Sequence, residues 1–123
     1  MKNNRNLNLY SKNYFQNLAE YTHKAARIIL NDLYKIFKFK SVVDIGCGPG
    51  DWLKAAKEVM DKSEKLTGVD GEYSKSIHVF DGANFIYTDL EKEIKVDKHD
   101  LAISLETAEH LSSERAESFI GDL

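Results

Sequence analysis

The chain has 123 residues, a formal net charge of −3 and 30% charged residues, which bounds it to at most one small globular domain. This charge balance offers no general attraction for phosphate backbones, and no basic stripe is visible, so the sequence disfavours a nucleic-acid partner. A single cysteine, Cys47, excludes an intrachain disulfide. No apolar run is long enough to span a bilayer, and the start lacks the apolar segment of a secretion signal, so we expect a cytoplasmic protein without a membrane partner.

The first 37 residues divide into a polar start and a long helical segment. Residues 1–10 are rich in Asn and are expected to form a flexible arm, and residues 11–123 are expected to form one domain. Apolar residues at helical spacing, without Gly or Pro, predict one or two helices over 11–37, with Ser11 as the N-cap. The positions expected to cover a sheet are Phe15, Leu18, Tyr21 or Thr22, Ala25, Ile28, Ile29, Leu33 and Ile36.

Beyond residue 40 the apolar pattern changes to short buried runs that alternate with helical segments. The runs predict strands over residues 41–46, 65–70, 84–89 and 100–106. The segments between and after them predict helices over 49–61 and 112–123, the last capped by Ser112 or Ser113. Strands that alternate with helices favour an α/β fold with a parallel sheet and helices on both faces.

The stretch "VVDIGCGPGDW" places three glycines directly after the first predicted strand. A strand, a tight glycine turn and a helix N-terminus together form a nucleotide-binding device, because glycine lets a ligand approach the backbone closely. The pattern is G-x-G-x-G, and Asp51 stands where a dinucleotide site has its third glycine. A carboxylate there would repel a pyrophosphate, which argues against an NAD-binding protein. The pattern favours a nucleoside ligand that has no phosphate and carries a positive amino group.

Two more carboxylates follow the next predicted strands. Asp70 ends the second strand, about 20 residues past the turn, where a carboxylate accepts hydrogen bonds from ribose hydroxyls. Asp89 ends the third strand, where a carboxylate or the neighbouring backbone meets the amino group of an adenine. Parallel strands bind ligands at their carboxyl ends, so we expect these groups to lie at one edge of the sheet. Cys47 has no basic neighbour in the sequence and is interpreted as a small wall residue, not as a nucleophile.

Four segments, "VVDIGCGPG", "LTGVDGEY", "FIYTDLE" and "DLAISLETAEHL", resemble the successive motifs of class I S-adenosylmethionine-dependent methyltransferases. The resemblance runs from Val42 to Leu111 and implies a Rossmann-like methyltransferase fold with S-adenosylmethionine as the cofactor. It implies that the methionine part of the cofactor lies by the glycine turn, its adenosine by the second and third strands, and its methyl group by the fourth. The cofactor-binding residues expected on this basis are Asp44, Gly46, Cys47, Gly48, Gly50, Asp70, Gly71, Asp89, Leu90, Leu105 and Glu106.

The segment "SLETAEHL" contains Glu106, Glu109 and His110 in an E-x-x-E-H spacing. Two carboxylates and an imidazole on one face suit a divalent ion such as Mg²⁺. Some family members, which act on catechol-like quinone precursors or on RNA ends, use this arrangement with a metal. Metal-free members also have Glu-His-Leu here, so the preferred interpretation is a pocket without metal. Glu106 and His110 are then the catalytic candidates, with His110 as the candidate general base.

The resemblance implies further strands that this chain does not supply, since only the first four are present. The fourth strand would then be an open edge, which favours self-association or pairing with a partner chain, and we expect the chain to be a fragment. The function expected is transfer of a methyl group to a small-molecule or sugar acceptor. The alternative is a non-catalytic module that binds the cofactor or a partner and lacks the acceptor site.

Overall fold

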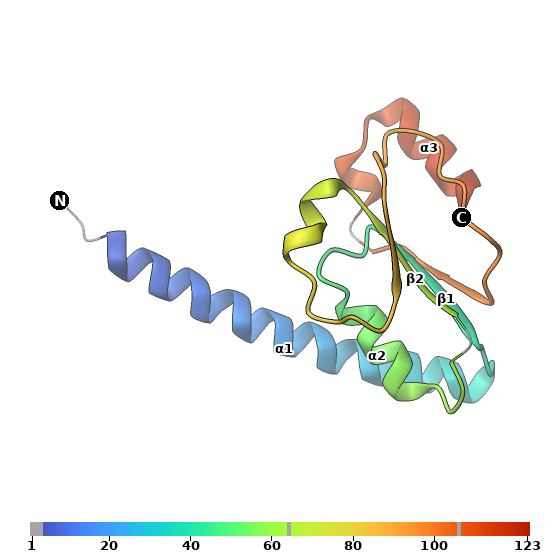
Figure 1. Ribbon diagram of the computed structural model, residues 1–123, viewed down its shortest axis with the longest axis horizontal. Helices are drawn as coiled ribbons and strands as arrows, with labels where there is room; N and C mark the ends of the chain where they lie inside the picture. The colour runs from blue at the N-terminus through green and yellow to red at the C-terminus, as the bar shows by residue number, and fades with distance from the viewer. Residues whose placement is uncertain (1–3, 64, 106) are drawn as a thin grey trace.

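The protein has one long helix followed by a parallel sheet with helices on both faces (Figure 1). The structure is a computed structural model that describes residues 4–63, 65–105 and 107–123, with backbone alone for residues 4–16. Its elements are α1 (Asn4–Ile36), β1 (Ser41–Ile45), α2 (Asp51–Val59), β2 (Lys65–Asp70), η1 (Glu72–Ser76), β3 (Asn84–Tyr87), β4 (Leu101–Ile103), η2 (Ala108–His110) and α3 (Ser113–Asp122).

The four strands lie in the order β3-β2-β1-β4, and every neighbouring pair is parallel. Val42 of β1 is in register with Leu66 on one side and with Leu101 on the other. β1 and β2 are buried along almost their whole length because helices cover both faces of the sheet. The predicted α/β, Rossmann-like arrangement is therefore confirmed, and the carboxyl ends of all four strands meet at one edge.

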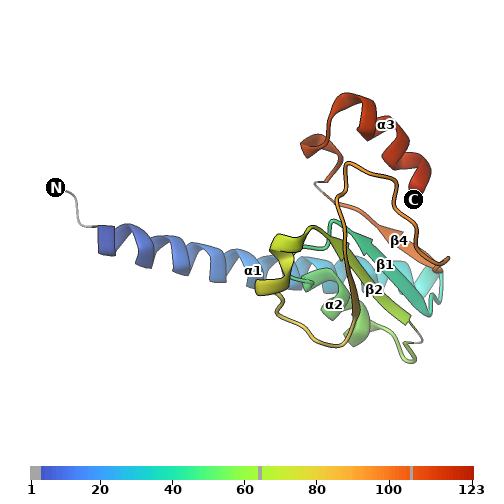
Figure 2. The same cartoon turned by 45° about the horizontal axis from the view of Figure 1, so that its top comes forward.

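Alternate residues of the central strands point to opposite faces of the sheet and belong to two hydrophobic cores. Val42 and Leu66 pack with Leu30, Leu53 and other apolar residues of α1 and α2. Val43, Ile45 and Val69 point to the opposite face, where they pack with Ile94 and with Phe119 of α3. Figure 2 shows α3 on one side of the strands and α1 with α2 on the other. No helix in the described part of the chain combines the length and apolar character needed to cross a membrane.

The long helix differs from the prediction in its start and in its buried face. It begins at Asn4 and not at Ser11, so residues 4–10, expected to form a flexible arm, are helical. No Gly or Pro interrupts this segment, and nothing in its sequence therefore ends the helix. The N-terminal part of α1 projects away from the sheet (Figure 1), and residues of its C-terminal part pack on α2.

The buried stripe of α1 consists of Ala26 and Leu30, continued by the partly buried Leu33. Leu18, Ala25, Ile28, Ile29 and Ile36 were expected to face the sheet, but all five are exposed, with 56% for Ile28, 53% for Ile29 and 85% for Ile36. That part of the prediction is wrong. The helix is apolar on more than one side, and the periodicity alone therefore left its orientation undecided.

The remaining elements agree with the prediction in type and differ in length. β2 has the predicted bounds, whereas β3 and β4 end earlier than expected, at Tyr87 and Ile103. α2 begins at Asp51 because Gly50 before it has a left-handed φ of 97°. The Ser112 hydroxyl accepts a hydrogen bond from the Arg115 amide, which confirms Ser112 as the cap of α3.

Candidate cofactor site

The turn after β1 is held against β2 by backbone hydrogen bonds. The amides of Gly46 and Cys47 both donate to the carbonyl oxygen of Val69, at 2.7 and 3.2 Å. Gly46, Gly48 and Gly50 all have positive φ values, of 83°, 52° and 97°. Residues with a Cβ rarely adopt this conformation, so the alternating glycines are what lets the chain turn sharply at the end of the sheet.

The first two glycines of the turn serve different purposes. A Cβ on Gly46 would lie 2.1 Å from Oγ1 of the buried Thr107, so this glycine allows close packing against the segment after β4. A Cβ on Gly48 would meet no atom within 4 Å. The backbone at Gly48 is therefore open to a ligand, whereas the backbone at Gly46 is closed from one side by the protein itself.

Asp70 is a buried carboxylate with three protein donors. Its Oδ2 atom accepts hydrogen bonds from the Gly48 amide at 2.7 Å and from the Tyr73 hydroxyl at 2.8 Å. Its Oδ1 atom accepts from the Gly71 amide at 2.8 Å. Partial burial of the hydroxyl, together with its hydrogen bond to Asp70, raises the pKa of Tyr73 to about 12. Asp70 thus ties β2 to the glycine turn and presents its carboxylate at the strand end.

Asp44, on β1, is buried to a similar degree but has a different environment. Only 3% of the residue is exposed, and no donor from the described residues is hydrogen-bonded to its carboxyl group. Burial, and then the charge of Asp70, raise the pKa of Asp44 to about 7. A buried carboxylate without a donor is costly. The arrangement therefore favours a cationic ligand beside Asp44.

Two cavities border Gly46, one on each side of the turn. The larger, of about 660 Å³, lies between the turn and α1. Its lining residues are Leu18, Ala19, Thr22, Ala25, Asp44, Gly46, Cys47, Gly48, Pro49, Asp51, Trp52 and Leu105. The smaller, of about 280 Å³, lies at the end of β2. Its lining residues are Gly46, Asp70, Tyr73, Leu90, Thr107, His110 and Leu111. Both cavities therefore contain carboxylates, Asp44 and Asp51 in the larger and Asp70 in the smaller.

Most of the predicted cofactor-binding residues line one of these cavities. The larger cavity contains Asp44, Gly46, Cys47, Gly48 and Leu105, and the smaller contains Gly46, Asp70 and Leu90. Three predicted residues, Gly50, Gly71 and Asp89, line neither. Gly50 packs against Phe85, Gly71 donates to Asp70, and the exposed Asp89 accepts a hydrogen bond from the Glu91 amide.

The predicted acidic and histidine group after β4 is described only in part. Glu106 lies outside the described residues. His110 borders the smaller cavity, and Glu109 is exposed and contacts His110, with 3.7 Å between Oε1 and Nε2. Among the described residues no group of three acidic, histidine or cysteine side chains is placed to hold a metal. The catalytic assignments of Glu106 and His110 and the metal alternative therefore stay predictions.

Tyr73 and Thr107 are among the residues of the site that were not predicted from the sequence. Tyr73 follows Asp70 by three positions in η1, and this spacing was the signal available for it. Thr107 lies under Gly46 and had no sequence signal, because the contact joins residues far apart in the chain. Cys47 is 8% exposed, and burial, followed by the charges of Asp44 and Asp70, raises the pKa of its thiol to about 12. This agrees with its interpretation as a wall residue.

A parallel sheet of this order, with a glycine turn after β1 and carboxylates at the ends of β1 and β2, defines the cofactor-binding part of a class I methyltransferase. Residues 23–119 match the FtsJ-like methyltransferase family, and the chain belongs to this family. The class expected from the four motifs is thereby confirmed, as is S-adenosylmethionine as the cofactor of that class.

Two curated relatives carry the name ribosomal RNA large subunit methyltransferase E. The protein of Methanococcus maripaludis strain C7 is 31% identical over 93 residues, which cover 75% of this chain and 34% of the relative. The protein of Methanococcus vannielii is 39% identical over 49 residues, or 39% of this chain and 19% of the relative. The matched part of the chain thus spans 34% and 19% of the length of these relatives.

Solved structures with the same fold include three methyltransferases. The plantazolicin methyltransferase BpumL, in complex with SAH, has a TM-score of 0.64 and 26% identity over 92% of this chain and 46% of that one. CalS10, a SAM-bound amino pentose methyltransferase from Micromonospora echinaspora, has a TM-score of 0.67 and 14% identity, covering 81% and 44%. The methyltransferase domain of bacterial CtHen1 has a TM-score of 0.65 and 23% identity, covering 84% and 59%. For the last two structures, the similarity to this chain shows a shared fold and no more.

Proposed function

We propose that this chain is the cofactor-binding part of an S-adenosylmethionine-dependent methyltransferase. The observation that carries the proposal is the pair of buried carboxylates, Asp44 and Asp70, which lie on either side of a glycine turn with open space at Gly48. One carboxylate has no donor, and the other already accepts from a hydroxyl. The pair suits a ligand with an ammonium group at one end and ribose hydroxyls in its middle.

The larger cavity fits the methionine end of the cofactor. The unpartnered carboxylate of Asp44 lines it and would pair with the ligand's ammonium group, which offsets the cost of burying this charge. The open backbone at Gly48 lets the ligand approach without meeting a side chain. Leu105 and the face of α1 that includes Thr22 close the other side of the cavity.

The smaller cavity fits the adenosine end. Asp70 would accept hydrogen bonds from the ribose hydroxyls, and the Tyr73 hydroxyl occupies one such position. Leu90 and Leu111 provide apolar surface for the purine ring. Asp89 uses Oδ1 to accept from the Glu91 amide, and its Oδ2 has no partner in the described part of the chain. That oxygen is available to an exocyclic amino group.

The bound cofactor supplies an electrophilic methyl group on its sulfonium, and the residues of this chain orient it. Asp44 would hold the ammonium group at one end of the ligand and Asp70 the ribose in its middle, which would bring the sulfonium between these two groups near Leu105. Methyl transfer depends mainly on aligning an acceptor atom with this group, which makes orientation the chief contribution of the protein. His110, 78% exposed by its side chain at the rim of the smaller cavity, is the candidate proton acceptor.

For the acceptor we propose RNA. The support is the membership of the FtsJ-like family and the name of the curated relatives, which act on ribosomal RNA according to that name. The second candidate is a small-molecule or sugar acceptor, which the net charge of −3 and the absence of a basic stripe favour. Transfer of a radiolabelled methyl group to ribosomal RNA, compared with transfer to aminosugar and peptide acceptors, distinguishes the two. Labelling of the small molecules alone would contradict the RNA proposal.

The cofactor proposal is tested by calorimetric titration of the protein with S-adenosylmethionine, S-adenosylhomocysteine and NAD. We expect binding of the first two in the micromolar range and none of NAD. Asp70→Asn should weaken binding by at least about tenfold, because it removes a charged acceptor at the ribose position. Asp97→Asn is the matched control, since Asp97 pairs with Lys65 at the opposite end of β2 and is exposed. A folded protein that binds neither sulfur ligand would contradict the proposal.

A further inference from the structure

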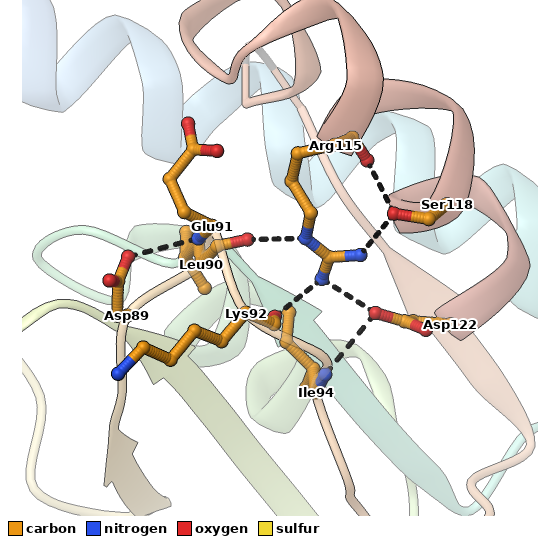
Figure 3. Close-up of polar contacts among 8 residues, drawn as sticks. All are labelled: Asp89, Leu90, Glu91, Lys92, Ile94, Arg115, Ser118 and Asp122. Carbon is orange, nitrogen blue, oxygen red and sulfur yellow. Dashed lines mark hydrogen bonds and ion pairs between the residues drawn. The ribbon is translucent and has the colours of Figure 1, made fainter.

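Arg115 is a buried arginine that extends from α3 to the loop after β3 (Figure 3). Its Nε donates to the Leu90 carbonyl oxygen at 2.9 Å, and its Nη2 donates to the Lys92 carbonyl oxygen at 2.6 Å. On its own helix, Nη2 also bonds Asp122 at 2.6 Å and Nη1 bonds Ser118 at 2.9 Å. A buried guanidinium needs such a set of acceptors, and two of the four come from the loop.

The loop that receives these bonds has no regular secondary structure from Thr88 onward. The Lys92 amide donates to the Asp89 carbonyl oxygen at 3.0 Å and closes a turn. The carbonyl groups of Leu90 and Lys92 have no strand partner, and the guanidinium of Arg115 binds both. The planar guanidinium of Arg115 fixes the distance between the carbonyl groups of Leu90 and Lys92. The flexible ammonium group of a lysine could not do this. The stretch 89–92, called here the 89–92 loop, is thus fixed by a side chain of a distant helix.

Two further contacts attach the same region to α3. Glu91 accepts hydrogen bonds from the amide and the hydroxyl of Ser112, both at 2.9 Å, at the start of α3. At the other end of α3, Asp122 accepts from the Ile94 amide at 3.2 Å and from Arg115. The hydrogen bond from Arg115 holds the pKa of the Asp122 carboxyl below its usual value. The segment from Leu90 to Ile94 is therefore attached to α3 at the start of the helix, through Arg115 and at the end of the helix.

The 89–92 loop carries one wall of the smaller cavity. Leu90, whose carbonyl oxygen Arg115 binds, lines this cavity together with Asp70. Asp89, which precedes it, presents the free Oδ2 described above. Arg115 itself does not line the cavity, so it acts on a ligand there only through the loop.

We propose that Arg115 is a positioning residue that sets the 89–92 loop for the adenine end of the cofactor. This inference rests on the proposed function. It makes α3, which lies on the opposite face of the sheet from α1 and α2, contribute to recognition of the purine. The recognition of adenine then depends on a side chain that the adenine never touches.

The experiment compares S-adenosylhomocysteine with S-inosylhomocysteine, which has a carbonyl oxygen in place of the purine amino group. Calorimetry gives the two Kd values for the unchanged protein, for Arg115→Lys and for Ser118→Ala. Ser118→Ala is the matched control, because it removes a partner of Arg115 that has no contact with the loop. Circular dichroism and thermal melting show whether each variant is folded.

We expect Arg115→Lys to weaken the binding of S-adenosylhomocysteine by about tenfold and that of S-inosylhomocysteine much less. The ratio of the Kd for the inosyl compound to the Kd for S-adenosylhomocysteine should then fall toward one. Ser118→Ala should leave both values unchanged. A purely structural role would lower the folded fraction, and both ligands would then weaken equally with the ratio intact. That result, or no change in either Kd, would overturn the inference.

A second variant decides the matter if Arg115→Lys does not fold. Glu91→Gln loses one of the two acceptors for Ser112 while leaving Arg115 in place, and it should lower the ratio by about threefold. An unchanged ratio there would count against the inference. If the unchanged protein binds S-adenosylhomocysteine but does not distinguish it from the inosyl compound, the proposed function stands and this inference fails. If it binds neither, both fail.

Discussion

Replacing Gly46 with alanine should destabilise the fold much more than the same change at Gly48. At Gly46 the new Cβ would lie 2.1 Å from Oγ1, 2.8 Å from Cγ2 and 3.0 Å from Cβ of Thr107, a buried residue with little room to move. Overpacking of this kind costs about 1–3 kcal/mol, and the left-handed φ of 83° adds about 1–2 kcal/mol. The expected loss is on the order of 3–4 kcal/mol.

Gly48 is the matched control within the same turn. It also has a positive φ, of 52°, but a Cβ there would meet nothing within 4 Å. Gly48→Ala should therefore cost only about 1 kcal/mol of stability. Its methyl group would stand in the larger cavity, so this variant should be folded and should bind S-adenosylhomocysteine more weakly.

Thermal unfolding followed by circular dichroism measures the difference. Gly46→Ala should lower the Tm by more than about 10 °C, and Gly48→Ala by about 5 °C. The double variant Gly46→Ala/Thr107→Ala removes Oγ1 and Cγ2 and should recover about 1–2 kcal/mol relative to the sum of the single changes. Equal stability of the two glycine variants, or strict additivity in the double variant, would refute the packing argument.

Three further predictions concern the carboxylates and the thiol. The pKa of Asp44 is raised to about 7, so the folded state is stabilised when this carboxyl group is protonated. The stabilisation is on the order of 4 kcal/mol, is complete below about pH 4 and is lost as the pH rises through about 7. Asp44→Asn should flatten that loss in urea titrations at about pH 5 and about pH 8, and an unaltered pH dependence would contradict the assignment. Tyr73→Phe removes the hydroxyl that competes with ribose for Asp70, so the Kd of S-adenosylhomocysteine measured by calorimetry should fall by about threefold to tenfold. Weaker binding would mean that the hydroxyl contributes to the bound state. Cys47, with a pKa of about 12, should resist iodoacetamide at about pH 8 in the folded protein and react once the chain is unfolded in urea, as mass spectrometry would report.

Local pattern was enough for the central strands and for the carboxylates near their carboxyl ends. The run from Val42 to Ile45 is buried on both faces and ends in a glycine, and such a run has few alternatives to a central parallel strand. The same reasoning placed Asp70 at the end of β2, and the structure puts it beside Gly48 as the parallel register requires. Strand ends that are adjacent in a sheet bring their side chains together whatever the loops between them do.

The sequence by itself therefore determined the fold class, the glycine turn and the carboxylates at the strand ends, because each depends on residues close together in the chain. Only the tertiary structure decided which stripe of α1 is buried, since that helix is apolar on more than one side and packs through Ala26 and Leu30. It also placed Thr107 beneath Gly46 and Arg115 on the 89–92 loop. These contacts join segments that are distant in the chain, and they form only when the sheet brings β1, β3 and β4 into position.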